Sequence, residues 1–473
     1  MELTNNISEL KALVLELLQR VSKLEKENIE LKKENIELKK ENSELKARLN
    51  LNSKNSSKPP STDGLRKKPA FEKPKNGKHG GQEDHKGKTL KMVEKPDNIV
   101  VGCVEKCGCG KNLSSQPFEV VGRRQVFEIP EPKLIVTEHQ NIQVVCPVCA
   151  KVHQSGFPQG VNAQTQYGNK ARAFVTLLNN EAKLSFEKTQ TIFYDLFGYQ
   201  INESTLIRAN EICYENLEQT QALIQQQILS SPTAHSDESG IRVKGKLNWL
   251  HVTSTELFTY FFVHPKRGKQ AIESEKSILG NFYGWLVHDC WSSYFGLTHS
   301  KHAICGAHLL RELQGLIEND SPWSADFKAF LLQVYHKPIE IRLQKQAEIE
   351  QNYDLLLTRG FSHEPEPVKT GKKGKFKRTK GRNLLERLQK YKSAVLAFAF
   401  NAEVPFTNNL AERDIRPIKV KQKISGSFRT EVGAQHYARI AGFISTVRKN
   451  KLNVFKELCN VFSGYSFLTL KTY

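Results

Sequence analysis

The sequence predicts an α/β fold in which helices pack against a sheet. Residues 233–265 alternate apolar and polar side chains in three runs separated by short turns, which is typical of antiparallel strands. Two short apolar runs follow, in "GWLVHDC" and "KHAIC", and helical spacing begins at "GAHLLRELQGLIE". This change of period along one stretch of chain favours a single sheet covered by helices.

The first fifty residues form a heptad repeat, with leucine at every seventh position from Leu3 to Leu45. The a positions of this repeat are Ile7, Val14, Val21, Asn28, Asn35, Asn42 and Leu49. Asparagine at the a position favours a coiled coil of two parallel helices, and Glu and Lys occupy the facing g and e positions. We therefore predict a parallel coiled-coil homodimer over residues 1–50, with a single solvated helix as the alternative.

The charge balance indicates a polyanionic partner. The 473 residues include 70 Lys and Arg against 50 Asp and Glu, a formal charge of +20, and nucleic acid is the commonest partner of such a chain. Residues 51–97 are rich in Ser, Pro, Gly and Lys, so we expect a basic flexible linker there. The sequence shows neither a signal peptide nor a membrane-spanning run, and we expect a cytoplasmic protein without a membrane partner.

Five of the nine cysteines fall between Cys103 and Cys149, which predicts a small zinc-binding domain over residues 98–155. Cys107 and Cys109 form one pair, and Cys146 and Cys149 form the other. Two expected strands, in "QVFEIP" and "KLIVTEHQNIQVV", lie between the pairs. Four thiolates satisfy a structural Zn²⁺ ion. Cys103 is a possible substitute ligand, and unliganded cysteines in a reduced protein are the alternative.

Residues 156–230 have helical spacing throughout. The stretch "SFEKTQTIFYDLFGYQINESTLIRAN" predicts a helix, a turn at Gly198 and a second helix beginning near Asn202 or Ser204. This is the pattern of a helix-turn-helix that could place a helix in a DNA groove, although ordinary helical bundles share it.

The order of elements after residue 231 is that of a ribonuclease H-like fold: three antiparallel strands, a helix in "KQAIESEKSILGNF", two further strands and a helix. In that fold an acid on the first strand and an acid at the end of the fourth lie side by side, and a third arrives on a later helix. Asp237 precedes the strand "GIRV", Asp289 ends "GWLVHD", and Glu412 lies in "TNNLAERDIRP". This last helix is expected to begin near Thr407 or Asn408 and to end at Pro417.

Three converging carboxylates would hold two Mg²⁺ or Mn²⁺ ions, since hard cations take oxygen ligands and two such ions can promote phosphodiester cleavage. We therefore predict Asp237, Asp289 and Glu412 as catalytic residues and metal ligands. The acids that compete for the third place are Glu256, Glu273, Glu403 and Glu431.

Basic residues surround Glu412 and fill a second stretch, residues 368–383, that contains no acid. We predict that both contact DNA. The predicted contacts are Arg413, Arg416, Lys419, Lys421, Lys423, Lys373, Lys375, Lys377 and Arg378.

With these residues in place, the chain resembles transposases of the insertion sequence 66 family, of the Asp-Asp-Glu type. The blocks that carry the resemblance include "DESGIRV", "HDCWSSY", "CGAHLLREL" and, most specifically, "NNLAERDIRPIKVKQKISGSFRTEVGA". It implies a triad at Asp237, Asp289 and Glu412, cleavage at the ends of a mobile element, and joining of the 3′ hydroxyls to target DNA. Cys305 and His308 have metal-ligand spacing, but the resemblance implies that they mark the start of a helix near the site.

The resemblance also implies the domain order: a catalytic domain over residues 231–311, a helical insertion over 312–400, and a closing helix with the C-terminal region over 401–473. Expected partners are DNA, a second copy of the chain and accessory proteins encoded by the same element. Two alternatives share some of these features. A zinc-dependent dimeric DNA-binding regulator would lack catalysis, and a coiled-coil scaffold would explain only the first fifty residues.

Overall fold

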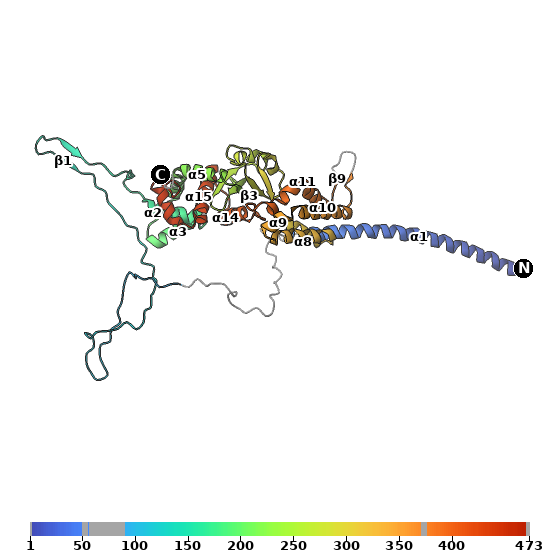
Figure 1. Cartoon of the computed structure of the whole chain (residues 1–473), viewed down its shortest axis with the longest axis horizontal. Helices are drawn as coiled ribbons and strands as arrows, with labels where there is room; N and C mark the ends of the chain where they lie inside the picture. The colour runs from blue at the N-terminus through green and yellow to red at the C-terminus, as the bar shows by residue number, and fades with distance from the viewer. Residues whose placement is uncertain (1, 50–54, 56–89, 370–375, 470–473) are drawn as a thin grey trace. The chain divides into compact units, whose positions relative to one another are not determined.

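The computed structural model of the chain describes residues 2–49, 55, 90–369 and 376–469. These residues divide into two units. One contains residues 1–64, 163–193 and 200–473, and the other contains residues 65–162 and 194–199. Figure 1 shows the elements named below. No helix in the described ranges is long and apolar enough to cross a bilayer. Most of the expected linker, like Lys373 and Lys375, lies outside the described residues.

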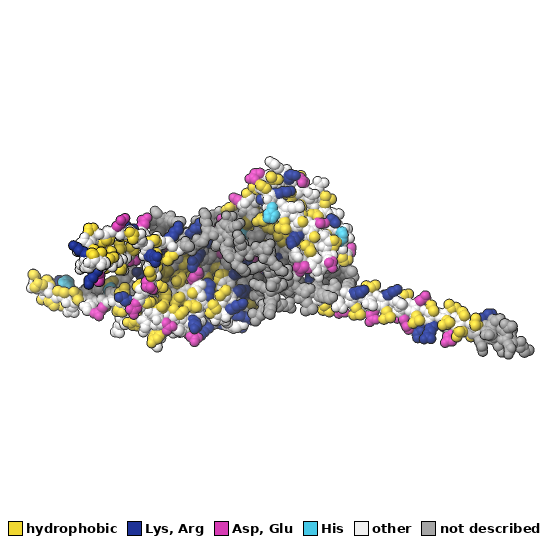
Figure 2. Space-filling view, turned by 90° about the horizontal axis from the view of Figure 1, so that it is seen from below, with side chains coloured by type: hydrophobic (Ala, Val, Ile, Leu, Met, Phe, Trp, Pro, Cys, Tyr) yellow, Lys and Arg dark blue, Asp and Glu magenta, His cyan; other side chains and the backbone are white. Residues whose placement is uncertain are grey.

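The N-terminal segment is one long helix, α1 (Glu2–Leu49). The d-position leucines from Leu10 to Leu45 are 49–61% exposed in the single chain. Figure 2 shows hydrophobic and charged side chains interspersed along this rod. An uncovered apolar seam of this length on an isolated helix is what a coiled-coil partner would bury.

The cysteine-rich unit contains a hairpin formed by β1 (Gln143–Val145) and β2 (Val152–Gln154), which pair antiparallel around the turn that carries Cys146 and Cys149. The predicted strands are wrong over most of their length, because only residues 143–145 of the expected stretches are extended in a ladder. The apolar side chains of these stretches face solvent, including Val126 and Ile135, which are 88% and 85% exposed. Without a buried face, the alternating pattern has nothing to pack against.

Four helices precede the sheet: α2 (Asn169–Asn180), α3 (Phe186–Phe197), α4 (Glu203–Asn216) and α5 (Glu218–Leu229). Gly198 follows α3 with φ +72°, a left-handed conformation that glycine adopts without strain, so the expected helix–turn–helix is present. On α4, Arg208 is paired with Glu211 at 2.6 Å and with Glu215 at 3.5 Å.

The five-stranded sheet has the order β5-β4-β3-β6-β7, so the predicted mixed α/β fold is confirmed. The first three strands, β3 (Thr233–Val243), β4 (Lys246–Ser254) and β5 (Thr259–His264), are antiparallel. The last two, β6 (Trp285–His288) and β7 (Lys301–Ile304), run parallel to β3. The helix expected after β5 is reduced to α6 (Lys269–Ile272) and a 3₁₀ turn, η2 (Leu279–Asn281). A second 3₁₀ turn, η3 (Tyr294–Gly296), follows β6.

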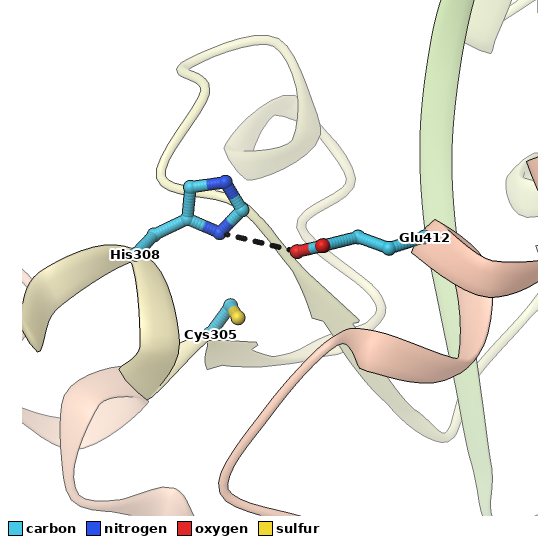
Figure 3. A group of neighbouring side chains, drawn as sticks. All are labelled: Cys305, His308 and Glu412. Atoms are coloured by element: carbon cyan, nitrogen blue, oxygen red, sulfur yellow. Dashed lines mark ion pairs between the residues drawn. The ribbon is translucent and has the colours of Figure 1, made fainter. Parts of the chain in front are cut away.

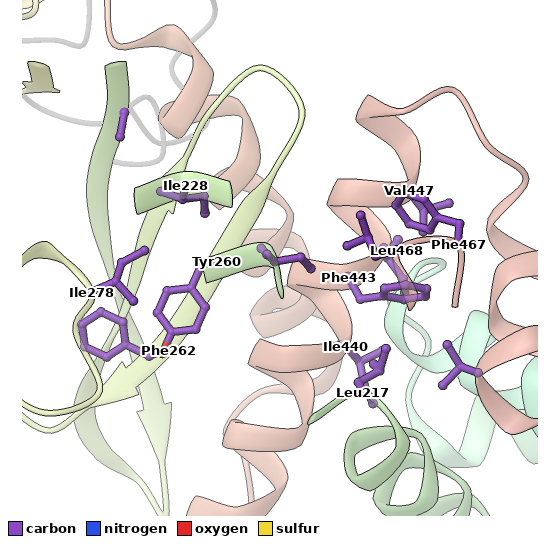
Figure 4. Close-up of a cluster of buried hydrophobic side chains, with 14 of the residues drawn as sticks. Leu217, Ile228, Tyr260, Phe262, Ile278, Ile440, Phe443, Val447, Phe467 and Leu468 are labelled. Carbon is purple, nitrogen blue, oxygen red and sulfur yellow. The ribbon is translucent and has the colours of Figure 1, made fainter. Parts of the chain in front are cut away.

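The alternation of side chains along the strands gives the sheet two apolar faces. On one face, Val252 and Val263 join a cluster with Ile415 of α14 (Asn409–Ser425) and Tyr437 of α15 (Glu431–Lys449). On the other, strand residues such as Tyr260 and Phe262 join a cluster that includes α5, α15 and α16 (Val454–Phe462), shown in Figure 4. A slip of one residue would move each side chain of a strand to the opposite face of the sheet, where it would meet a different set of helix side chains. Burial of these side chains therefore specifies the strand register.

A helical segment separates α7 (Gly306–Ile317) from α14, where the insertion was expected. Its elements are α8 (Pro322–His336), α9 (Ile339–Gln344), α10 (Gln346–His363), β8 (Val368–Lys369), β9 (Phe376–Lys377), α11 (Lys380–Lys390), α12 (Lys392–Val395) and α13 (Ala397–Phe400). A core around Trp323, Phe327 and Leu385 holds these helices together.

The closing helix contradicts the sequence in one respect. Pro417 was expected to end it, but α14 continues through the proline to Ser425. A proline inside a helix removes one N–H group and costs about 3 kcal/mol. Here Ile415 and Ile418, on either side of Pro417, are both buried against the sheet. Their burial outweighs the local cost.

Candidate active site

The sheet register brings Asp237 and Asp289 together. β3 and β6 are parallel, with Thr233 opposite Trp285 and His235 opposite Val287. Continuing this register by two residues places Asp237 opposite Asp289, which follows directly after β6. The sequence suggested that Asp237 precedes the first strand, but Asp237 lies within β3. Neighbouring residues of parallel strands point to the same face, and the charge of Asp289 contributes to the raised pKa of Asp237, so the two acids are near one another.

Asn408 fixes the third acid. It is the residue before α14 and is 1% exposed. Its Oδ1 lies 2.9 Å from His235 Nδ1, and its Nδ2 donates to the carbonyl oxygen of Ser236 at 2.8 Å. These bonds attach the start of α14 to the two residues that precede Asp237. Glu412 comes one helical turn after Asn408 and so lies on the same helix face.

The competing acids do not share this place. Glu256, Glu273, Glu403 and Glu431 are all exposed, and Glu431 is the first residue of α15.

Burial and mutual repulsion characterise the site. Burial raises the pKa of Asp237 well above its usual value, and the charges of Glu238, Asp289 and Glu412 add to this effect. Burial likewise raises the pKa of Asp289. Asp237 Oδ1 accepts a hydrogen bond from the backbone N–H of Glu238 at 2.9 Å, and Asp289 Oδ1 accepts one from the backbone N–H of Trp291 at 3.0 Å. Such crowding of buried acids is characteristic of sites that bind cations.

Sequence reasoning missed a fourth acid, Glu238, whose side chain is 1% exposed. Its Oε1 accepts from the Arg267 guanidinium at 2.7 Å, and its Oε2 accepts from the Tyr294 hydroxyl at 2.6 Å. The guanidinium lies between the rings of Trp249 and Trp291, with its central carbon 5.1 and 4.2 Å from their centroids. Arg267 thus compensates the charge of Glu238. The adjacent acids in "DESG" were the available signal.

A second group of ligand-type side chains adjoins Glu412 from α7. Cys305, His308 and Glu412 each offer one atom, and these atoms lie within 4.8 Å of one another (Figure 3). Glu412 Oε1 lies 3.7 Å from His308 Nδ1 and 3.6 Å from the Arg311 guanidinium. Burial lowers the pKa of His308 to about 4, so its ring is neutral near pH 7.

The basic residues of α14 face different surroundings. Arg413, Arg416 and Lys423 are exposed, and Arg416 lies 3.5 Å from Glu412 Oε2. Lys419 is half-buried and donates to the Gly240 carbonyl oxygen at 3.1 Å. Lys421 is 6% exposed and donates to the carbonyl oxygens of residues 179 and 184, so the prediction that it contacts DNA is wrong.

In the basic stretch of the insertion, Lys377 belongs to β9, and Arg378 is paired with Glu386 at 3.0 Å.

The four predicted zinc ligands remain as two separate pairs. Within the described residues, the group whose ligand atoms lie within 4.8 Å of one another is Cys305, His308 and Glu412. Neither the four cysteines nor the three acids Asp237, Asp289 and Glu412 form such a group in this described part of the chain. Each pair lies in a tight turn: Gly110 N donates to Cys107 O at 2.8 Å, and residue 150 N donates to Cys146 O at 2.9 Å. Backbone N–H groups lower the pKa of the Cys109 and Cys146 thiols, which favours the thiolate form that metals bind.

Comparison with known families assigns the chain. A sequence model of the transposase IS66 family matches residues 164–436, more than half of the chain and all three acids. The chain belongs to the transposase IS66 family. This membership supports a DNA-processing enzyme with DNA as its partner. A second model, described as a family of unknown function (DUF6444), matches residues 2–91. No curated protein matches the chain.

Proposed function

We propose that the chain is a transposase that cleaves the ends of an insertion sequence and joins the 3′ hydroxyls to target DNA. One observation carries this proposal. Asn408 joins the start of α14 to the residues before Asp237, and the charges of Asp289 and Glu412 both act on Asp237, within a ribonuclease H-like strand order, which supports a site shared by the three acids. Family membership supports the substrate class.

The donor set fits hard divalent cations. Asp237 and Asp289 each engage only Oδ1 in a hydrogen bond within the described residues, which leaves Oδ2 for a ligand. Glu412 Oε1 is buried and accepts no hydrogen bond there. Mg²⁺ or Mn²⁺ bound by these carboxylates would activate the attacking oxygen and stabilise the leaving oxygen. A bound cation would also favour the ionised form of Asp237, which burial and its acidic neighbours otherwise disfavour.

The other side chains would orient the DNA and the ligands. Arg413 and Lys423, exposed on α14, would contact phosphates near the scissile bond. Arg267 holds Glu238 in place, so that this acid supports β3 beside the site without repelling DNA as a free charge. Arg416 lies against Glu412 Oε2 and would orient its carboxylate.

The appended parts would bring two catalytic cores together. The exposed leucine seam of α1 supports a parallel coiled-coil homodimer, which would hold two chains on two element ends. Zn²⁺ bound by Cys107, Cys109, Cys146 and Cys149 would draw the two turns of the cysteine-rich unit together and order its apolar segments.

The test is cleavage and strand transfer of linear DNA that carries the element's inverted ends, with Mg²⁺ or Mn²⁺. Wild-type protein is expected to nick at the ends and join them to a plasmid. Asp289→Asn and Glu412→Gln are expected to bind the same DNA but to lose about a hundred- to a thousandfold in cleavage rate, the scale seen when an essential charge-stabilising group is removed. Asp326→Asn changes an exposed acid on α8 and serves as the control. Cleavage by Asp289→Asn at the control's rate would refute the assignment.

A further inference from the structure

Glu412 is shared between the proposed active site and a second group of ligands on α7. Cys305 Sγ, His308 Nδ1 and Glu412 Oε1 belong to a cluster whose ligand atoms lie within 4.8 Å of one another. His308 Nδ1 and Glu412 Oε1 are both buried and make no hydrogen bond within the described residues, although they face each other at 3.7 Å. Figure 3 shows the imidazole and the carboxylate aimed at each other with the thiol beside them. Buried polar atoms are normally satisfied, so this pair indicates an absent ligand.

The backbone holds these side chains at this spacing. Cys305 is the residue before α7, and His308 follows three residues later on the same helix face. Gly306 N donates to Phe406 O at 2.8 Å, and Asn408 N donates to Cys305 Sγ at 3.1 Å. A Cβ atom on Gly306 would collide with the Phe406 ring, so only glycine permits this approach. The starts of α7 and α14 are therefore joined directly, and the cluster is preorganised.

The donor set favours a thiophilic cation. A thiolate and an imidazole nitrogen bind Zn²⁺ or Co²⁺, whereas Mg²⁺ takes oxygen ligands. One thiolate and one carboxylate would balance the two positive charges, and the Asn408 N–H already points at the sulfur, as hydrogen-bond donors do around metal-bound thiolates. Arg311 lies 3.6 Å from Glu412 Oε1, and its side chain is 22% exposed, so it has access to solvent when a cation arrives.

We propose that a thiophilic divalent cation such as Zn²⁺ binds Cys305, His308 and Glu412 and inhibits the enzyme by holding Glu412 away from Asp237 and Asp289. Binding releases the thiol proton to solvent and leaves the fourth coordination position to water. The inhibition rests on the proposed function, whereas the binding does not. One carboxylate would thus switch between a hard-metal site and a soft-metal site.

The binding test uses full-length protein and Co²⁺, whose thiolate bond absorbs in the near ultraviolet. Metal-free protein is titrated with Co²⁺ in excess Mg²⁺, and bound metal is counted after gel filtration. Because the paired cysteines of the other unit are proposed to bind metal as well, the readout is the difference in bound metal between variants. Cys305→Ser and His308→Gln are each expected to lose one equivalent of metal, and Cys305→Ser to lose one thiolate band. Cys459→Ser, outside the cluster, is the control and is expected to match wild type. Full stoichiometry in both cluster variants would overturn the site.

The inhibition test adds micromolar Zn²⁺ to the Mg²⁺-dependent cleavage assay. Wild type and Cys459→Ser are expected to slow at least tenfold, and His308→Gln to keep most of its zinc-free rate. Equal inhibition of wild type and His308→Gln would overturn the switch. Wild-type protein that never cleaves DNA would refute the proposed function and with it the inhibition, while the Co²⁺ titration would still decide the binding site.

Discussion

Replacing Asn408 tests how the structure holds the third acid. The Asn408 side chain is buried and bonded to His235 Nδ1 and Ser236 O. Asn408→Ala would leave both groups buried and unpaired, at about 1–3 kcal/mol each. A water molecule admitted to the vacated space would restore part of this loss. We therefore expect the free energy of unfolding to fall by about 2–4 kcal/mol, which lowers the melting temperature by roughly 4–16 °C for a domain of this size class.

The matched control is Asn409→Ala. Asn409 is exposed and is the first residue of α14, so its replacement should change stability by less than about 0.5 kcal/mol. Thermal unfolding followed by circular dichroism gives the stability. Cleavage is then measured at a temperature at which both variants are folded. There we expect Asn408→Ala to be slower by about 100-fold, since a ligand misplaced by about 1 Å has an effect of this order. Equal melting temperatures of Asn408→Ala and Asn409→Ala, or equal cleavage rates of the two folded variants, would refute the view that Asn408 positions Glu412.

Three further predictions address other parts of the chain. Lys423→Ala should weaken DNA binding and reduce its salt dependence. Lys421→Ala should leave DNA binding unchanged and lower the melting temperature, because Lys421 is buried. Fluorescence anisotropy at several salt concentrations measures the DNA binding of the two variants. Burial lowers the pKa of His251 to about 4, so the unfolded chain binds an extra proton between about pH 4 and 6.5, and the free energy of unfolding falls as the pH drops through that range. His251→Gln should make this fall shallower when the free energy of unfolding is measured by urea titration at several pH values. An unchanged dependence on pH would contradict the prediction. Leu24→Glu, in the α1 seam, should convert the proposed dimer to a monomer in light scattering, while Ile29→Glu, equally exposed but at a b position, should not.

The sheet could be predicted from sequence because its pattern is local. Alternation over residues 233–265 gives antiparallel strands, and the apolar run before Asp289 gives a buried parallel strand. The position of Asp237 within β3 was not predictable in this way. Its strand begins at Thr233 with small and polar residues, and these are extended because they pair with β6, a partner more than fifty residues later.

The errors on α14 have a common cause. Pro417 carries a local signal to end a helix, and Lys421 carries a local signal for solvent or phosphate. Both signals are overruled by packing between distant segments. Ile415 and Ile418 bury one face of the helix on the sheet, and the Lys421 ammonium satisfies carbonyl oxygens at the end of α2 and after it. Such long-range partners leave no trace in the residues next to the proline or the lysine.

The position of Glu412 follows from contacts at the start of its helix. Asn408 bonds to β3 through its side chain and to Cys305 through its backbone N–H, so the same residue joins α14 to the sheet and to α7. Glu412, one turn later, lies 3.7 Å from His308 and is near enough to Asp237 for its charge to act on that aspartate. A carboxylate fixed at such a junction can serve either set of ligands but not both, so the affinities and concentrations of the two kinds of ion would determine which set holds it.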